Sequence, residues 1–386
     1  MCGNACTGFA RRRVSFGITD MIRSMAQVPP APDTESWPLQ RLMTEVVGTG
    51  IKSAQDLTRP QATAAMRQIL AGDPDPTTLG AFWLANRWKH NTPEELAAYA
   101  DVMMEQTQVA RPAVDPVDCG ANYDGKGRTA ILGVIAGLIA AGAGTPVVVH
   151  SGDRVPTQKQ DAYKHVLDAL GVRTELQPAE SAEMTDAVGF GFYYQPAFAP
   201  HIAALTDRRD QMGVRTFINT IETIANPAGA HVHLGSFYHL AFAKKIVDTF
   251  AAMEHDSPRR VVMFQGMEGY DDIRPGYTTV GESTDGKFTD YTIEPDRYDL
   301  TFTEEDLAVE GADVAGASAR ITEAVLAGEA SAPVRDAALL NAALRIFARE
   351  DAPSLEDGIR WHARASQAAR HRGCSNRPAD SEQISG

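Results

Sequence analysis

From Val117 onward, short runs of β-branched and apolar residues alternate with longer stretches that have apolar residues at helical spacing. Residues 147–149 and 261–264 are two such runs, and residues 161–170 and 237–253 have the spacing of amphipathic helices. Strands that alternate with helices favour an α/β fold with a mostly parallel central sheet. This pattern constrains the fold more than any other feature of the chain.

Ligands of such folds bind in the loops that follow the carboxyl ends of the strands. Three polar or glycine-containing segments are expected to follow strands, namely residues 120–126, 150–154 and 266–272. Because parallel strands end at the same edge of a sheet, we expect these three segments to lie close together at one edge.

The region before residue 109 has a different pattern, with several marked helix starts. Thr58 is followed by Gln61, and Thr92 by Glu95, which is the spacing of a capping box, and Asp75 precedes a proline. These signals predict three or four short helices. We therefore expect a helical domain at 36–108, which later helices could join, and a larger α/β domain at 109–372, with disordered segments at 1–35 and 373–386.

The chain has 386 residues, of which 44% are hydrophobic and 22% charged, and this balance allows a large core without metal or disulfides. Four scattered cysteines indicate a reducing compartment. No apolar run reaches the roughly 18–20 residues that span a bilayer. We therefore expect a cytoplasmic protein with no secretory signal and no membrane partner. The net charge of −14 disfavours nucleic acid as a partner, although a local basic patch would allow it.

The segment from Asp118 to Thr129 carries the strongest chemical signal. It contains Gly120, Gly125 and Gly127 with Lys126 and Arg128, and an apolar helix is expected to follow. A glycine-rich turn before a helix exposes backbone N–H groups and suits a phosphate or another anion. In the alternative interpretation, the glycines serve only the geometry of a tight turn. The residues alone leave both interpretations open.

Six segments in order resemble motifs of the anthranilate phosphoribosyltransferase family, and together they extend from about residue 40 to 368. The segments are 79–96 (with LGAF and KHNTPEEL), 120–125 (GANYDG against GTGGDG), 192–200, 209–227 (with RxxMGVRT and NP), 266–272 (GxxGYDD) and 336–358. The resemblance implies transfer of a phosphoribosyl group from phosphoribosyl diphosphate to an aromatic amine, with anthranilate as the acceptor, as in tryptophan biosynthesis.

The same resemblance assigns expected roles to individual residues. Asp271 and Asp272 would hold Mg²⁺, and oxygen ligands suit that metal; a solvated turn is the alternative. Arg209 would contact the acceptor's carboxylate, and His150 would contact a ribosyl or acceptor group; a salt bridge and a structural histidine are the respective alternatives. The expected substrate-binding residues are Gly120, Asn122, Asp124, Gly125, Lys126, Arg154, Lys159, Arg215 and Asn219.

The chain also departs from the family's pattern. Residues 130–133 read AILG where the family has NIST, and Glu222 begins the segment that reads GPLTNP in the family. These changes keep two other hypotheses open. One is a non-catalytic protein on the same fold that binds nucleic acid or another ligand. The other is a nucleoside phosphorylase, although the lysine-histidine-serine phosphate motif of that group is absent.

The family commonly forms homodimers through its helical domain. The apolar residues Phe82, Trp83 and Trp88 offer more apolar surface than a small bundle needs. We therefore expect a homodimer that uses this face.

Overall fold

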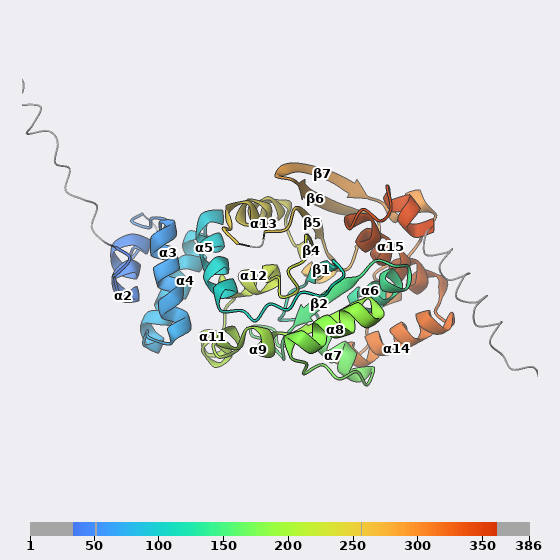
Figure 1. The fold of residues 1–386 in the computed structure, drawn as a ribbon, viewed down its shortest axis with the longest axis horizontal. Coiled ribbons are helices and arrows are strands. Elements are labelled where there is room, and N and C mark those ends of the chain that lie inside the picture. Colours follow the sequence, from blue (N-terminus) through green and yellow to red (C-terminus); the bar gives the residue numbers. More distant parts are fainter. Residues whose placement is uncertain (1–33, 51, 256, 361–386) are drawn as a thin grey trace, which may run out of the picture.

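The computed structural model describes residues 34–50, 52–255 and 257–360, so the tail expected after residue 372, and all but the end of the extension expected at 1–35, lie outside the described residues. The described part of the chain starts with a bundle of helices at one end, and α14 (Val314–Ala327) and α15 (Ala332–Ala348) lie at the other end (Figure 1). The bundle consists of α2 (Leu39–Leu42) with a π-helical turn at Met43–Val47, α3 (Arg59–Ala71), α4 (Pro76–Lys89) and α5 (Pro93–Glu105).

The helix starts of the bundle follow the signals in the sequence. Asp75 accepts hydrogen bonds from the backbone N–H groups of Thr77 and Thr78 at 3.0 Å each. Thr92 N donates to Glu95 Oε2 at 2.8 Å, and Glu95 N donates to Thr92 Oγ1 at 3.2 Å. Both arrangements satisfy backbone donors that have no partner inside the helix. The predicted starts of α4 and α5 are therefore confirmed.

A seven-stranded sheet forms the larger part, with the strand order β3-β2-β1-β4-β5-β6-β7. The first five strands in this order are parallel, and β6 and β7 are antiparallel. The mostly parallel sheet expected from the sequence is therefore confirmed. The strands are β1 (Val117–Gly120), β2 (Val147–Ser151), β3 (Phe190–Tyr194), β4 (Val232–Phe237), β5 (Arg260–Gln265), β6 (Thr278–Thr284) and β7 (Lys287–Ile293).

The connecting segments contain further helices, and short 3₁₀ turns lie at 222–224, 267–269, 295–298 and 305–307. The helices are α6 (Gly133–Gly142), α7 (Tyr163–Ala169), α8 (Pro178–Val188), α9 (Gln195–Phe198), α10 (Pro200–Ala203), α11 (Thr206–Met212), α12 (Ile218–Ile221) and α13 (Leu240–Ala252). None of the helices in the described ranges is both long and apolar enough to cross a membrane.

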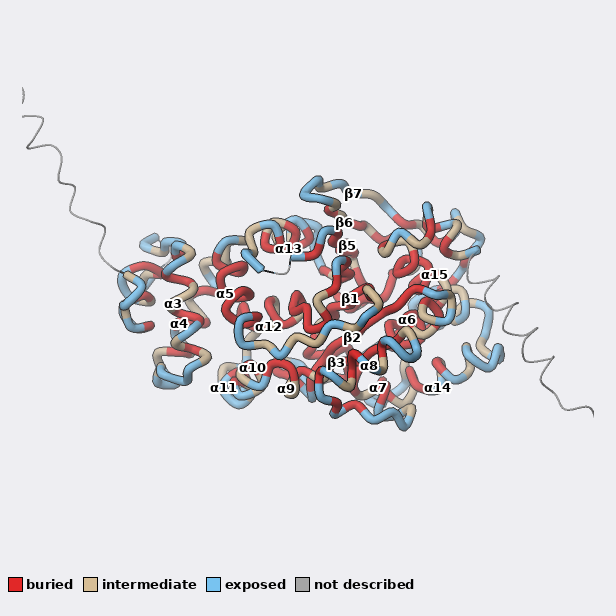
Figure 2. The backbone as a smooth tube through the Cα atoms, in the orientation of Figure 1, coloured by how far each residue is buried: buried red, intermediate tan, exposed pale blue. Residues whose placement is uncertain are grey.

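Successive residues of the strands face two different cores. Val147 and Val149 of β2 pack in one core with α6, α7, α14 and α15, whereas Val148 packs in the other. The second core also contains α13 and the apolar faces of α3, α4 and α5, so the bundle and one face of the sheet share a single core. This alternation follows from the two-residue period of a strand and explains why the parallel strands are mostly buried on both faces (Figure 2).

Phe82 and Trp83 belong to this second core, where they are 0% and 1% exposed. The expectation that they contribute to a dimer surface is therefore wrong, because they pack inside their own chain. Trp88, further along α4, is 67% exposed, so its side chain can still contact a partner chain.

Phe217, just before α12, joins the bundle to the α/β part. Its ring stacks on Tyr99 of α5 with 4.2 Å between centroids and meets the edge of Phe82 of α4 at 6.4 Å. We expect Phe217→Ala to lower the free energy of unfolding by about 3–5 kcal/mol, the usual cost of removing a buried aromatic ring. Tyr277→Ala, at a position that is 55% exposed, should stay within about 0.5 kcal/mol of the wild type. Urea denaturation measures both. Equal effects would show that Phe217 does not carry the junction.

Candidate active site

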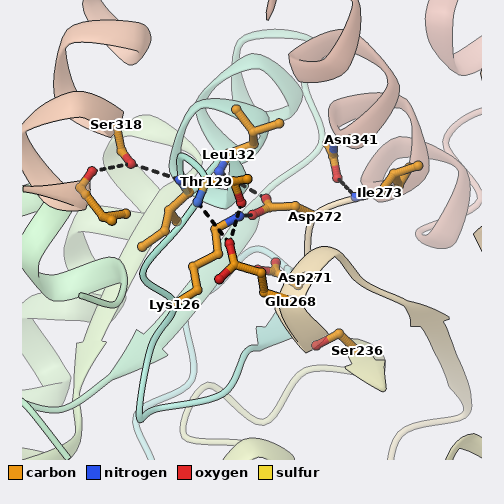
Figure 3. A network of polar contacts seen from close by, with 12 residues as sticks. Lys126, Thr129, Leu132, Ser236, Glu268, Asp271, Asp272, Ile273, Ser318 and Asn341 are labelled. Atoms are coloured by element: carbon orange, nitrogen blue, oxygen red, sulfur yellow. Dashed lines mark hydrogen bonds and ion pairs between the residues drawn. The ribbon is translucent and has the colours of Figure 1, made fainter. Parts of the chain in front are cut away.

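The loops after β1, β2 and β5 meet at the carboxyl edge of the sheet, as the sequence predicts. The side-chain amide of Asn122 donates to the carbonyl oxygen of Gly269 at 2.6 Å, and the hydroxyl of Ser236 donates to the same oxygen at 2.8 Å. The hydroxyl of Tyr123 lies against Nδ1 of His150. The loop after β1, hereafter the glycine loop (residues 120–129), therefore contacts the segment 266–272, hereafter the acidic loop (Figure 3).

Lys126 is the central cation of this edge. Its side chain is 0% exposed, and its Nζ donates to Oδ2 of Asp272 at 2.5 Å. The other carboxylate oxygen of Asp272 accepts the backbone N–H of Leu132, at the start of α6, at 3.0 Å. One buried carboxylate therefore connects the glycine loop and the beginning of α6 to the acidic loop (Figure 3).

Asp271 has a separate buried partner. Nη2 of Arg345, on α15, donates to Oδ2 of Asp271 at 2.6 Å, and both side chains are 0% exposed. Burial raises the pKa of Asp271, although the charge of Arg345 acts in the opposite direction. Arg345 also donates to the carbonyl oxygen of Asn341 at 3.0 Å.

These pairings do not fit the magnesium role that was expected for Asp271 and Asp272. Each carboxylate already has an internal cation within 2.6 Å, and neither is exposed. A divalent ion added there would place excess positive charge in a buried site. Within the described residues, no group of three or more His, Cys, Asp or Glu side chains could hold a metal ion.

The expected substrate-binding glycines are packed against protein backbone. A Cβ at Gly120 would lie 1.9 Å from the carbonyl oxygen of Thr223, and one at Gly125 would lie 2.3 Å from that of Asp161. Gly125 also has φ +79°, a conformation that favours glycine. At these two positions the geometric interpretation of the glycines holds, because neighbouring segments fill the space that a side chain would need.

Asp124 and Glu222 each hold an arginine through two hydrogen bonds. Arg215 donates to both oxygens of Asp124 at 2.8 Å, and Arg209 donates to both oxygens of Glu222 at 2.8 and 2.7 Å. Arg209 and Glu222 are each 2% exposed, so Arg209 does not offer its guanidinium to an acceptor in this arrangement. Burial raises the pKa of Glu222, and the charge of Arg209 opposes this effect.

The segment after β2 brings two more predicted cations to the glycine loop, and both are paired. Arg154 lies 2.6 Å from Asp161, and Lys159 lies 2.7 Å from Asp210. Asn219 has a structural position, since its side chain accepts the N–H of Thr216 at 3.0 Å and donates to the Pro156 carbonyl oxygen at 3.1 Å. Each cation predicted for the substrate site thus has a carboxylate of its own chain as a partner.

His150 lies on β2, inside the protein. Its Nε2 lies 3.4 Å from Oδ1 of Asp118, and the second oxygen of Asp118 lies 2.8 Å from Nδ1 of His233 on β4. Burial alone would raise the pKa of Asp118, but the two histidines outweigh it and lower this pKa. Because His150 is fully buried, direct contact with a substrate does not fit this arrangement, and the structural interpretation is the one that fits.

Glu268 is a site residue that the sequence reasoning missed. Its carboxylate accepts hydrogen bonds from the backbone N–H of Thr129 at 2.9 Å and from the Thr129 hydroxyl at 2.7 Å. It also accepts from Arg128 Nε at 3.3 Å and from the Gly127 N–H at 3.4 Å. Burial raises the pKa of Glu268, but the Thr129 hydroxyl and the charge of Lys126 outweigh this and lower it, so the group is an anion.

A cavity of about 220 Å³ opens beside Glu268. Its lining includes Arg128, Tyr238, Gln265, Glu268, Arg274 and Glu304. Glu268 lies between the two glycines of the predicted acidic loop, and this spacing was the only sequence signal that could have drawn attention to it. Asp118 begins the segment that the sequence singled out but was given no role, because its partners His150 and His233 lie on other strands. His233 and Arg345 were missed because they lie on a strand and a helix far away in the chain.

We expect Lys126→Met to lower the free energy of unfolding by about 3–5 kcal/mol, because it leaves the Asp272 carboxylate buried without a counter-charge. The double variant Lys126→Met/Asp272→Asn removes both charges and should recover much of that loss. Lys159→Met, whose lysine is 47% exposed, should cost less than about 1 kcal/mol. Urea denaturation of the three variants tests this. A single variant as stable as the wild type would contradict the role given to the buried pair.

Comparison with known proteins agrees with this architecture. Residues 45–107 match the helical bundle domain of the glycosyl transferase family, and residues 111–369 match the a/b domain of that family. The anthranilate phosphoribosyltransferase of Methanocorpusculum labreanum is 33% identical over 81% of this chain and 90% of the relative. That of Anaeromyxobacter sp. (strain K) is 35% identical over 83% of this chain and 94% of the relative.

Solved structures show the same likeness. Anthranilate phosphoribosyltransferase from Thermus thermophilus superposes with a TM-score of 0.69 at 28% identity, and the match covers 81% of this chain and 91% of that one. The enzyme from Saccharomyces cerevisiae in complex with PRPP (phosphoribosyl diphosphate) and Mg has a TM-score of 0.66 at 18% identity, with 81% and 90% covered, which shows the shared fold. From the two matched domains and the identity over most of its length, the chain belongs to the glycosyl transferase family that includes the anthranilate phosphoribosyltransferases.

Proposed function

We propose that the protein is a pentosyltransferase that moves the phosphoribosyl group of phosphoribosyl diphosphate to the nitrogen of an aromatic amine. The observation that carries this proposal is the position of the glycine loop, which follows β1 at the carboxyl edge of the sheet, where ligands of such folds bind. The names of the relatives support phosphoribosyl transfer over the two alternatives, a non-catalytic binding protein and a nucleoside phosphorylase. A cytoplasmic location suits this activity.

Exposure separates the predicted cations into two groups. Lys126 and Arg209 are 0% and 2% exposed, and breaking either pair would leave a buried charge without compensation. Arg154, Lys159 and Arg215 are 55%, 47% and 39% exposed. Lys159 and its partner Asp210 are both exposed, and such a pair contributes only about 0–1 kcal/mol, so Lys159 can exchange its carboxylate for a ligand's phosphate at small cost. Arg154 and Arg215 also reach solvent, but their partners Asp161 and Asp124 are each 3% exposed, so a phosphate would have to add to these pairs and not replace them. We assign phosphate binding to the exposed group and loop positioning to the buried group.

The reaction breaks the bond between C1 of the ribose and the diphosphate oxygen and forms a bond from C1 to the amine nitrogen, which loses one proton. Negative charge grows on the departing diphosphate. Exposed guanidinium groups such as Arg215 would stabilise that charge, and the loops around the site would hold donor and acceptor together. No covalent intermediate with the protein is needed.

Two features of the family's chemistry change in this proposal. Arg209 is held by Glu222, so an acceptor's carboxylate would need a different cation. Anthranilate, named for the relatives, is therefore the first acceptor to test, together with aromatic amines that lack a carboxylate. Mg²⁺ accompanies the donor in the yeast structure, but Asp271 and Asp272 as arranged here do not fit as its ligands, and we assign no residue of this chain to it.

A diphosphate-release assay tests the proposed function without presupposing the acceptor. The full chain should release diphosphate from phosphoribosyl diphosphate when an aromatic amine is present. Arg215→Gln should lower kcat/KM by roughly 10- to 100-fold, as expected for the loss of a charged contact of about 1.4–2.8 kcal/mol. Arg297→Gln, which removes an exposed arginine paired with Glu294, should leave the rate unchanged. No amine-dependent release at millimolar donor would contradict the proposal and favour a binding function.

We also propose that the protein forms a homodimer through the bundle. A groove of about 580 Å³ on the bundle is lined by apolar side chains that include Met43, Val47, Leu84 and Trp88. The exposed indole of Trp88 beside this groove is the kind of aromatic anchor that fills a pocket of a partner. A second copy of the chain is the occupant that fits the symmetric assemblies common among soluble proteins.

Trp88→Asp should shift the protein toward the monomer, because a charge would then lie at the centre of the contact. Light scattering after size exclusion, at micromolar protein, measures the mass. Leu326→Asp on α14, at a position that is 61% exposed, is the control and should leave the dimer intact. A wild type that is monomeric at this concentration would rule out the proposed contact.

A further inference from the structure

The donors that surround Glu268 form the strongest unassigned feature of the structure. The last part of the glycine loop, residues 127–129, points two backbone N–H groups and the Thr129 hydroxyl at the Glu268 carboxylate. The guanidinium of Arg128 adds a fourth donor at 3.3 Å. Backbone N–H groups, a hydroxyl and a guanidinium are the donors that proteins use for a phosphate group.

The backbone of Glu268 is strained where it reaches these donors. Its φ is +55° and its ψ is 15°, a left-handed conformation that residues other than glycine rarely adopt. Such a conformation persists only where the surrounding contacts hold it. The hydrogen bonds from residues 127–129 are among these contacts, together with the turn bonds from the N–H of Gly269 to the Gly266 carbonyl oxygen and from the N–H of Tyr270 to the Met267 carbonyl oxygen.

The carboxylate also has a route by which to leave. The side chain of Glu268 is 10% exposed and lines the cavity of about 220 Å³, together with Arg128 and Arg274. Asp272, on the same loop, is 0% exposed and is held by Lys126 and by the N–H of Leu132. The acidic loop therefore contains one carboxylate that lines a cavity and one that is fully buried. Both side chains are labelled in Figure 3.

We propose that residues 127–129 form a binding site for a phosphate group and that Glu268 is the resident anion of that site, which a phosphate ligand must displace. The carboxylate accepts the hydrogen bonds that phosphate oxygens would accept, so the chain competes with its own ligand. Arg128, which is 72% exposed, can follow the incoming anion. The proposal concerns the site of the proposed function and rests on that function only for the identity of the ligand.

Calorimetry with inorganic phosphate on the full chain tests this directly. Glu268→Ala removes the competing anion, and Glu268→Gln removes its charge while it keeps its size. Both variants should bind phosphate at least about tenfold more tightly than the wild type, which corresponds to about 1.4 kcal/mol. Glu304→Gln is the matched control. Glu304 lines the same cavity but is not among the residues that accept the hydrogen bonds of residues 127–129, so this variant should change the affinity less than about twofold.

The proposal would be overturned if the Glu268 variants bound phosphate no more tightly than the wild type or Glu304→Gln. If Glu268→Ala fails to fold, Glu268→Gln carries the test, because its amide oxygen can still accept from Thr129. The outcome is independent of turnover. Tighter phosphate binding without diphosphate release would support the anion site and contradict the proposed reaction. Diphosphate release without any gain in phosphate affinity would support the reaction and contradict the anion site.

Discussion

The buried pair of Lys126 and Asp272 fixes the arrangement of the candidate site. Asp272 accepts both the ammonium of Lys126 and the backbone N–H of Leu132, so the glycine loop, the start of α6 and the acidic loop share one carboxylate. Removing two charges from water is costly, and the pair is tolerated because these two donors satisfy it. Arg345 on α15 holds the neighbouring Asp271 in the same way. These two buried pairs connect the loops at the carboxyl edge of the sheet, next to the exposed cations.

In the loops at this edge, carboxylates of the chain occupy the positions where an anionic ligand would be expected. Asp124 holds Arg215, Glu222 holds Arg209, and Glu268 holds the end of the glycine loop. These three contacts differ in what it costs to break them. The Arg209–Glu222 pair is buried, whereas Arg215 and Glu268 both reach solvent or a cavity. We propose that a phosphorylated ligand takes the place of Glu268 on the glycine loop and adds to the exposed guanidinium of Arg215, while the buried pairs remain as they are.

Local signals in the sequence predicted most of the fold and the place of the site. The caps at Asp75 and Thr92, the valine run of β2 and the glycine loop depend on neighbouring residues, and each was found where expected. The ionic partners could not be predicted in this way. Lys126 and Asp272 are 146 positions apart, and Arg345 and Asp271 are 74 apart, so only the folded chain brings them together. The same side chains that suggest a metal or phosphate site in a sequence become an internal ion pair once such a partner is near.

A crystal structure of the full chain with phosphoribosyl diphosphate and Mg²⁺ would test the anion-exchange account most directly. The account predicts a ligand phosphate on the N–H and hydroxyl of Thr129, with the Glu268 carboxylate displaced into the cavity. It also predicts that the Lys126–Asp272 and Arg345–Asp271 pairs are unchanged. A metal ion coordinated by Asp271 and Asp272, with Lys126 turned away and Glu268 still on the glycine loop, would contradict it.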